Sequence, residues 1–500
     1  GEDVMDYKAK FDQLVEKEQY LAAYQHLQEH AIHAYEDNFI NANMGWILNQ
    51  LRRYEEALAY LRKALRQDEK DGWIYGQIGF AYNHLDDVQN SLFYLRKALE
   101  YGEDVAWVHA EIGYAYHVQG AYRKAIEAYQ NALLEDQNNI WVKEQCAKCM
   151  LAQQEYEEAS ILLRQVIEQE PKQIESRLLL ASLYEQQADY QAAIKVLSCL
   201  EKTNDAEVLF HLGVCLRRIN DPQQALAYLL RAHEAGKDDT ALQSELGYVY
   251  LQSNEKEQAD ACFRQALSYY QQALRKERHT VDIYHEMALL YDQIQEYEQA
   301  IDCLMKIAEK DQANDAIWEQ IAHLYGKMGD HEQAVIFLWK CKESERGIEW
   351  HSQLAWNYGR LREHEQALRC LKQAEKLGRN DVWFELEVAW NYTQLKAYER
   401  SLAHYEKALA MSENDAWIRS QIAWNYGMLK RHEEAIALFS ALISEHYENG
   451  WLYANLAWNY LEEKKTQKAY AALLKAKAYD PEDEWIREQL AHMETDRRQL

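Results

Sequence analysis

The apolar and polar positions of this chain repeat with a period of about 34 residues. The clearest copies are four five-residue segments that each end in Ala-Trp-Asn-Tyr, namely Leu354–Tyr358, Val388–Tyr392, Ile422–Tyr426 and Leu456–Tyr460. We call the alanine before this tryptophan the anchor of its repeat and count it as the eighth position. A small residue recurs at the same spacing in both directions from these copies, so the pattern organises the whole chain.

Eleven of the fourteen steps between successive anchors are 34 residues long. The exceptions end at Gly213 (two residues shorter), Ala288 (seven residues longer) and Ala355 (one residue shorter). Most anchors are followed twelve residues later by a second small residue and seven residues further on by a third. Two helices approach closely only where side chains are small, so this spacing predicts one antiparallel helical hairpin per repeat. The anchors are Phe11 (a degenerate copy), Gly45, Gly79, Gly113, Ala147, Ala181, Gly213, Gly247, Ala288, Ala322, Ala355, Ala389, Ala423, Ala457 and Ala491.

A unit of about 34 residues with small–x2–Tyr, then Ala–x3–aromatic or Leu, then Ala, resembles the tetratricopeptide repeat family. The resemblance covers essentially the whole chain. It implies an all-α, right-handed superhelical solenoid of about fourteen hairpins with a C-terminal capping helix. The chain departs from the family in two ways. The family's tryptophan at the fourth position occurs only at Trp318, and its proline near the end of the repeat occurs only at Pro171 and Pro481. In place of that proline we expect Asp or Asn to cap the next helix. These caps are Asp71, Asn139, Asp381, Asp415, Asn449 and Asp483.

Tryptophan content and regularity divide the chain into four segments. Residues 1–171 are a tryptophan-containing array whose first hairpin caps the N-terminal end, and residues 172–314 are an irregular array without tryptophan. Residues 315–481 are a second, tryptophan-rich array, and residues 482–500 are a capping helix.

The longest step, which ends at Ala288, contains a duplicated ending, Gln-Ala-Leu, within Cys262–Leu274. Seven extra residues are close to two helical turns, so we expect the insertion to lengthen a helix without rotating its face. A neutral duplication is the favoured interpretation. The alternative is a protruding helix for docking or homo-oligomerisation.

Composition agrees with a helical solenoid, since only 3 prolines and 18 glycines occur in 500 residues. The net charge of −27 argues against nucleic acid as a partner and leaves room for a basic one. No apolar run is long enough to cross a bilayer, and we expect a soluble, cytoplasmic protein without membrane contact. Gly1 in place of methionine suggests either a scar of the expression sequence or an excised upstream segment.

The residues that could carry chemistry do not assemble into a recognisable catalytic or metal motif. Cys146 and Cys149 flank an anchor on the buried side of a helix, where we interpret them as small buried hydrophobes. His331, His364 and His432 occupy the turn position where other copies have tyrosine. We therefore expect no enzyme activity, cofactor or metal ion.

The second, sixth and ninth positions of each repeat share one face of the first helix, because residues seven apart differ by about 20° and residues four apart by about 40°. The resemblance implies that this face lines a concave groove. Aromatic planes beside an amide or carboxylate suit an extended peptide. The predicted groove residues are Trp73, Gln77, Trp107, Glu111, Trp141, Gln353, Trp356, Trp383, Glu387, Trp390, Trp417, Gln421, Trp424, Trp451, Asn455 and Trp458.

A structural role competes with binding at these positions, because neighbouring first helices could stack their tryptophans as a ladder. The asparagines after the ninth-position tryptophans (Asn357, Asn391, Asn425 and Asn459) are expected to form hydrogen bonds between repeats. The sequence therefore predicts a protein-interaction scaffold that binds a peptide or partner segment of basic character. The alternatives are a regulatory or sensor array of a larger enzyme and a carbohydrate-binding module.

Overall fold

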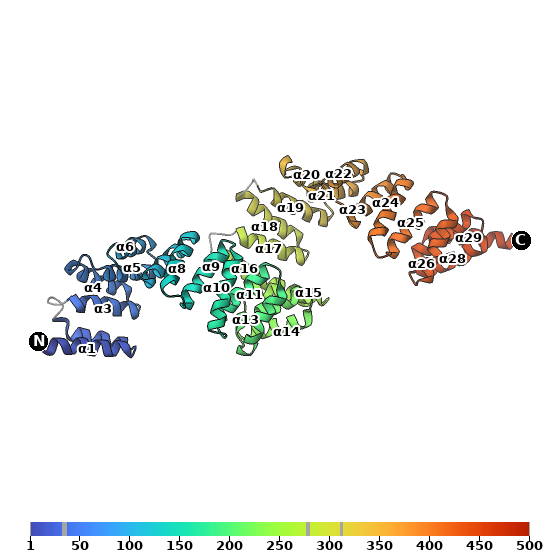
Figure 1. Ribbon diagram of the computed structural model, residues 1–500. Helices are drawn as coiled ribbons and strands as arrows, with labels where there is room; N and C mark the ends of the chain where they lie inside the picture. Colours follow the sequence, from blue (N-terminus) through green and yellow to red (C-terminus); the bar gives the residue numbers. More distant parts are fainter. Residues whose placement is uncertain (1, 33–37, 277–280, 311–313, 500) are drawn as a thin grey trace. The chain divides into compact units, whose positions relative to one another are not determined.

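The structure is a computed structural model that describes residues 2–32, 38–276, 281–310 and 314–499. The described residues form 29 α-helices and no strand. They divide into two compact units, residues 1–266 and residues 267–500, and the boundary falls within α16. In each unit, consecutive helices pack as hairpins, and successive hairpins lie side by side (Figure 1).

The first unit contains fifteen complete helices and the 3-10 helix η2 (Ser198–Thr203). The helices are α1 (Glu2–Glu16), α2 (Tyr20–Glu29), α3 (Asn38–Gln50), α4 (Tyr54–Gln67), α5 (Gly72–His84), α6 (Val88–Glu100), α7 (Ala106–Val118), α8 (Tyr122–Glu135), α9 (Ile140–Ala152), α10 (Tyr156–Gln169), α11 (Ile174–Gln186), α12 (Tyr190–Leu197), α13 (Ala206–Arg218), α14 (Pro222–Glu234) and α15 (Thr240–Gln252).

The second unit follows the boundary helix α16 (Lys256–Leu274) and includes the 3-10 helix η3 (Glu343–Glu345). Its helices are α17 (Val281–Gln293), α18 (Tyr297–Lys310), α19 (Asp315–Met328), α20 (His331–Trp339), α21 (Ile348–Arg360), α22 (His364–Lys376), α23 (Val382–Gln394), α24 (Tyr398–Met411), α25 (Ala416–Met428), α26 (His432–Ser444), α27 (Gly450–Glu462), α28 (Thr466–Tyr479) and α29 (Glu484–Gln499).

The anchors lie where the two helices of a hairpin cross. A Cβ atom built on Gly113 would come within 2.6 Å of the Tyr129 ring, and one built on Gly79 within 2.5 Å of Leu95. Only a glycine or a well-fitted alanine allows this approach. The alanine anchors, such as Ala389 and Ala423, are fully buried. The predicted helical hairpins are thus confirmed, and the odd-numbered helix is the first helix of each repeat.

The predicted helix caps are confirmed as well. The side chain of Asp71 accepts hydrogen bonds from the backbone N–H groups of Trp73 and Ile74, and Asn449 accepts one from Leu452. Equivalent bonds form at Asn139, Asp381, Asp415 and Asp483. These side chains satisfy N–H groups that the first turn of a helix leaves without a partner.

The irregular elements also follow the predictions. The insertion lengthens α16 to 19 residues, whereas the corresponding helix α14 of the preceding repeat has 13. The first hairpin, α1 and α2, buries Phe11 of its leading helix in a core that it shares with α3, and the last described element is the single helix α29. None of the described helices combines the length and the apolarity that a membrane span requires.

Candidate functional site

In the first unit, the sixth-position residue of a repeat accepts hydrogen bonds from a side chain of the preceding repeat. Asn49 Nδ2 donates to the backbone oxygen of Gln77 at 3.1 Å and to its Oε1 at 3.3 Å. Asn83 Nδ2 donates to Glu111 Oε2 at 2.7 Å and to its backbone oxygen at 3.0 Å. Both asparagines occupy the twelfth position of their repeats. This contact joins one first helix to the next.

The same pair of positions forms polar contacts between charged or titratable side chains later in the first unit. Glu185 Oε1 lies 2.8 Å from His211 Nδ1, and Arg217 Nε donates to Glu245 Oε2 at 2.5 Å. The bond between the twelfth position and the next sixth position therefore recurs, although the residue types change. Burial raises the pKa of Glu111 to about 7, an effect that the hydrogen bond from Asn83 only partly opposes.

The second-position tryptophans of the first unit lie on α5, α7 and α9. Trp107 packs against Gly76, where an added Cβ would come within 2.5 Å of the indole. Trp141 meets Tyr129 edge-on at 6.2 Å between ring centroids and keeps 43% of its surface exposed. Trp73 is half-buried and packs against the hydrophobic core that α1 to α5 share. Only the Trp141 ring therefore presents a large open surface in this row.

In the second unit, glycine replaces the twelfth-position asparagine and a tryptophan occupies the space. A Cβ atom on Gly326 would lie 2.7 Å from the Trp356 ring. Trp356 also meets His331 edge-on at 5.1 Å, and His331 Nδ1 lies 2.9 Å from Asn357 Oδ1. The same arrangement recurs twice. Its members are Gly359, His364, Trp390 and Asn391 in one copy, and Gly427, His432, Trp458 and Asn459 in the other.

The fourth joint of this kind differs in two residues. Thr393 occupies the twelfth position, and Tyr398 stands in place of the histidine and meets Trp424 edge-on at 5.8 Å. Asn425 Oδ1 then has no hydrogen-bond partner among the described residues, although its Nδ2 donates to the backbone oxygen of Gln421 at 2.9 Å. The ninth-position tryptophans thus contribute to a ladder between repeats. The packing role predicted for the histidines is confirmed, as are the bonds between repeats predicted for Asn357, Asn391 and Asn459.

The second-position tryptophans of the second unit are the more open ones. Trp417 meets Tyr405 edge-on at 6.4 Å and is 47% exposed, while Trp451 meets Phe439 at 6.2 Å and is 43% exposed. Trp383 is half-buried, and the Arg379 guanidinium lies 4.6 Å from its ring centroid. Exposed aromatic surface therefore follows α25 and α27.

In the second unit, the sixth-position side chains do not receive the hydrogen bond that Asn49 and Asn83 donate in the first unit. Gln353 Oε1 and Glu387 Oε2 are buried without a hydrogen-bond partner in the described part of the chain. Burial raises the pKa of Glu387, and Arg360, 3.5 Å from its other oxygen, opposes that effect. Asn455 Nδ2 donates within its own helix to Trp451. The Gln421 side chain is half-buried on α25.

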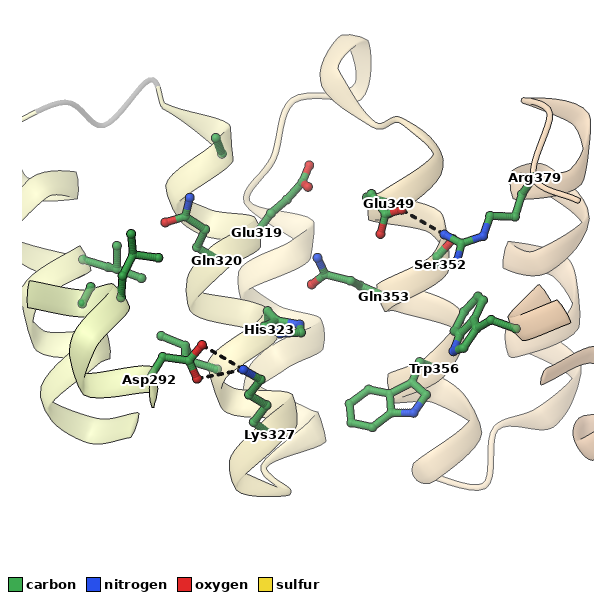
Figure 2. A pocket seen from close by; sticks show the side chains of 16 residues that line it. Asp292, Glu319, Gln320, His323, Lys327, Glu349, Ser352, Gln353, Trp356 and Arg379 are labelled. Atoms are coloured by element: carbon green, nitrogen blue, oxygen red, sulfur yellow. Dashed lines mark hydrogen bonds and ion pairs between the residues drawn. The ribbon is translucent and has the colours of Figure 1, made fainter. Parts of the chain in front are cut away.

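A pocket of about 760 Å³ opens between α17, α19, α21 and α23 of the second unit (Figure 2). It includes Gln353, Trp356 and Trp383 from the predicted groove. Figure 2 shows Gln353 extending from α21 toward the helix that carries Gln320 and His323. The other lining residues are Ala288, Leu289, Asp292, Leu304, Ala316, Glu319, Gln320, His323, Leu324, Lys327, Glu349, Ser352 and Arg379.

Sequence reasoning did not anticipate the wall of this pocket that α17 and α18 form, because these helices belong to the stretch without tryptophan. It also missed the exchange of asparagine for glycine at the twelfth position, which was visible in the sequence. Asn49 and Asn83 stand where Gly326, Gly359 and Gly427 stand later in the chain. The comparison of equivalent positions across repeats, rather than a search for known motifs, would have found it.

Buried thiols behave as predicted for Cys146 and Cys149. Burial raises the pKa of each thiol to about 12, so neither forms an appreciable amount of thiolate at neutral pH. No disulfide links the described cysteines. These side chains contribute apolar volume to the core.

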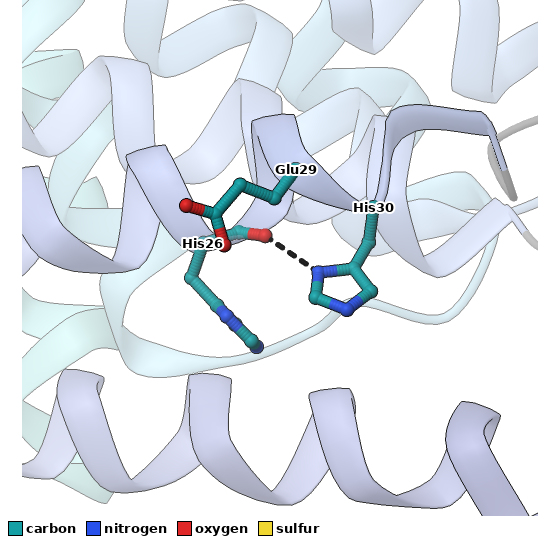
Figure 3. Close-up of side chains that lie close together, drawn as sticks. All are labelled: His26, Glu29 and His30. Atoms are coloured by element: carbon teal, nitrogen blue, oxygen red, sulfur yellow. Dashed lines mark hydrogen bonds between the residues drawn. The ribbon is translucent and has the colours of Figure 1, made fainter.

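One group of side chains in the described residues is close enough to share a metal ion. The ligand atoms of His26, Glu29 and His30 lie within 4.8 Å of one another (Figure 3). His26 Nε2 lies 2.9 Å from the backbone oxygen of Tyr7, and His30 Nδ1 lies 2.9 Å from the backbone oxygen of His26. Because these contacts join α1 to α2 and close the last turn of α2, we interpret the group as part of the packing of the first hairpin.

Comparisons with known families agree with the repeat. Profiles described as Tetratricopeptide repeat match residues 116–183 and residues 40–71, 281–314 and 316–347. A profile described as Tetratricopeptide Repeats-Sensor matches residues 189–291. Together these matches span just over half of the chain. A search among curated proteins found no match.

Several solved structures are similar to the chain at low identity. One is the APC/C hetero-tetramer Cut9-Hcn1, with 15% identity over 97% of this chain and 95% of that chain and a TM-score of 0.42. A second is YrrB, described as a TPR protein with an unusual peptide-binding site, with 18% identity, coverage of 38% and 97%, and a TM-score of 0.34. A third is a tetratricopeptide repeat protein from Parabacteroides merdae, with 16% identity, coverage of 51% and 98%, and a TM-score of 0.38. Likeness of this degree carries no information about what this chain binds.

Proposed function

The chain belongs to the tetratricopeptide repeat family, and from this membership we propose that it is a non-catalytic protein-interaction scaffold. The second unit binds an extended segment of a partner protein along the first helices α21, α23, α25 and α27. The observation that supports this site most directly is the pair of buried oxygen atoms, Gln353 Oε1 and Glu387 Oε2, that have no partner in the described chain.

A buried polar atom without a hydrogen bond costs roughly 1–3 kcal/mol, so proteins rarely retain one without a reason. Both oxygens are acceptors, and an extended peptide offers N–H donors along its length. In the first unit the equivalent groups of Gln77 and Glu111 already receive a bond from asparagine. The second unit therefore has the polar atoms that a ligand could satisfy.

The exposed tryptophans supply the apolar part of the same surface. Trp417 and Trp451 each rest one edge on a buried aromatic ring and leave nearly half of the indole open. Tryptophan is enriched among residues that dominate binding energy, because it buries a large area with few rotatable bonds. The net charge of −27 favours a partner segment of basic character.

The experiment compares two tryptophans that lie on the same helix and differ in burial. A randomised peptide library selects ligands for the full chain, and the affinity of the selected peptides is then measured for Trp417→Ala and Trp424→Ala. We expect Trp417→Ala to cost about 2 kcal/mol of binding and little stability. Trp424→Ala, which removes a contact between repeats, should cost about 3 kcal/mol of stability.

A large fall in melting temperature for Trp417→Ala with unchanged peptide affinity would show that the second-position tryptophans are structural, and the proposed groove would be wrong. A glycan array measured in parallel separates the carbohydrate-binding alternative. Binding of a glycan in place of peptides, lost in Trp417→Ala, would assign the same surface to a sugar.

A regulatory role is the second candidate function. The match of residues 189–291 to the profile described as Tetratricopeptide Repeats-Sensor favours it. In this case the array transmits the binding of its ligand to an associated enzyme. Co-purification with mass spectrometry tests this candidate, because it requires a catalytic protein to be recovered in stoichiometric amount.

A further inference from the structure

The pocket between α17, α19, α21 and α23 has one carboxylate that no described residue neutralises. Lys327 Nζ lies 2.8 and 2.9 Å from the two oxygens of Asp292. Arg379 lies 2.9 Å from Glu349 and 3.0 Å from Asp381. Glu319 receives no hydrogen bond and forms no ion pair with any described residue. The two cations of the lining are therefore already paired, and Glu319 leaves a net negative charge.

The environment of Glu319 disfavours that charge. Burial is the main reason that the pKa of Glu319 is raised, and repulsion from Glu349 and Asp315 adds to it. The neighbouring imidazole does not relieve the repulsion, because burial and Lys327 lower the pKa of His323 and keep the ring neutral near pH 7. A positive group from outside the chain would remove this unfavourable interaction.

A second acceptor faces the same space. Gln353 Oε1 is buried and has no hydrogen-bond partner in the described residues. In Figure 2, Glu319 and Gln353 project from α19 and α21 into the space between these two helices. A ligand with several N–H donors on one planar group can reach two acceptors at once, which a single ammonium does less well.

Part of the lining is apolar. Leu289 of α17 lines the pocket with 42% of its surface exposed, and Ala288, Leu304 and Leu324 are also lining residues. A ligand that matches both the apolar and the acidic part has an aliphatic stem and a cationic end. Arginine is the amino acid with this shape, since its methylene groups cover apolar surface while the guanidinium remains among polar groups.

We propose that this pocket binds one arginine side chain of the partner protein, with the stem on Leu289 and the guanidinium between Glu319 and Gln353. The inference rests on the proposed function, because it names a residue of the partner segment that continues from the groove at α21 and α23 into the pocket beside α17 and α19. The pocket volume of about 760 Å³ leaves room for the flanking backbone as well. An anionic ligand is disfavoured because it would meet Glu319 while Lys327 and Arg379 remain paired.

The test uses two small probes that differ in charge. Nα-acetyl-L-arginine amide and Nα-acetyl-L-citrulline amide are titrated into the full chain labelled with 5-fluorotryptophan, and the fluorine resonances of Trp356 and Trp383 are followed. These resonances are assigned with Trp356→Phe and Trp383→Phe. We expect the arginine probe to shift them with at least about tenfold higher affinity than the citrulline probe.

Variants locate the interaction. Glu319→Gln keeps the size of the side chain and should lower the affinity for the arginine probe about tenfold. Glu375→Gln, an exposed position on α22 outside the pocket, should leave it unchanged. Leu289→Ala should weaken both probes, because both share the aliphatic stem. Circular dichroism of each variant shows whether the fold is retained.

Equal affinity for the two probes, or an unchanged affinity in Glu319→Gln, would overturn the inference. That result leaves the proposed function standing if selected peptides still lose affinity in Trp417→Ala. Selection of arginine-containing peptides whose affinity falls in Glu319→Gln supports the inference in full. Binding of the free arginine probe combined with no arginine preference in peptides would refute a protein side chain as the occupant.

Discussion

Replacing Glu111 with glutamine should stabilise the first unit, and only at neutral and alkaline pH. Glu111 lies on α7 and accepts a 2.7 Å hydrogen bond from Asn83. Burial raises its pKa from 4.5 to about 7. The folded chain therefore keeps this proton up to a higher pH than the unfolded chain does. Stability falls as the pH rises from about 4.5 to about 7, since the folded state binds more protons in that window.

The magnitude follows from the shift. Each unit of pKa corresponds to about 1.4 kcal/mol, so the charged carboxylate costs up to about 3 kcal/mol above pH 7. Glutamine has the same size, retains an oxygen that accepts from Asn83, and does not titrate. Glu111→Gln should therefore equal the original chain at pH 4 and exceed it by up to about 3 kcal/mol at pH 8.

Long repeat arrays unfold in parts, so the assay must report on the region that contains α7. We suggest amide hydrogen exchange of peptides from α5–α8 in urea, measured at pH 4 and pH 8 with corrections for the intrinsic exchange rate. Glu245→Gln, followed through peptides from α13–α15, is the matched control, because that sixth-position carboxylate pairs with Arg217. It should lose about 1–2 kcal/mol at pH 8. An equal effect of Glu111→Gln at both pH values, or a loss at pH 8, would refute the reasoning.

Three further predictions concern stability. Tyr398→His should supply Asn425 Oδ1 with the bond that His364 gives Asn391, raising stability by about 1 kcal/mol in urea denaturation, and a loss would show that the ring contact with Trp424 matters more. Ala188 has a φ of 58°, which disfavours any residue with a Cβ, so Ala188→Gly should stabilise the turn before α12 by up to about 1 kcal/mol. The reverse change at Gly120 (φ 77°), Gly120→Ala, should destabilise its turn to a similar extent in the same assay. Deletion of Ser268–Leu274 should preserve the helical circular-dichroism spectrum. Loss of partner binding in the folded deletion would assign a docking role to the insertion.

Local physics explains why so much of the fold was predictable. The anchor spacing forces a helical crossing in every repeat, and Gly113 and Ala389 lie at such crossings in the structure. The caps at Asp71 and Asn449 depend only on the residues that follow them within one turn. Even the insertion obeyed a local rule, since seven residues complete close to two turns of α16.

The candidate site was less predictable because it depends on contacts between repeats. The sequence placed Trp356 and Trp417 on one helical face, yet the first packs into a joint and the second is nearly half exposed. The difference arises from neighbours in the preceding repeat, such as Gly326 for the first and Tyr405 for the second. The pocket requires the spacing of four helices, and no periodicity within one repeat contains that information.

The residue at the twelfth position determines which side chains of the next repeat pack against it. Asn83 is long enough to reach the sixth-position group of the next repeat, whose ninth position is Tyr114. Gly359 has no side chain that could donate. Trp390 packs against it, and Glu387 Oε2 has no hydrogen-bond donor among the described residues. The tryptophan then packs in the joint between repeats, and the sixth-position acceptor keeps no donor from the described chain. Two positions therefore change together: the twelfth from asparagine to glycine, and the ninth of the next repeat from Phe80 or Tyr114 to tryptophan.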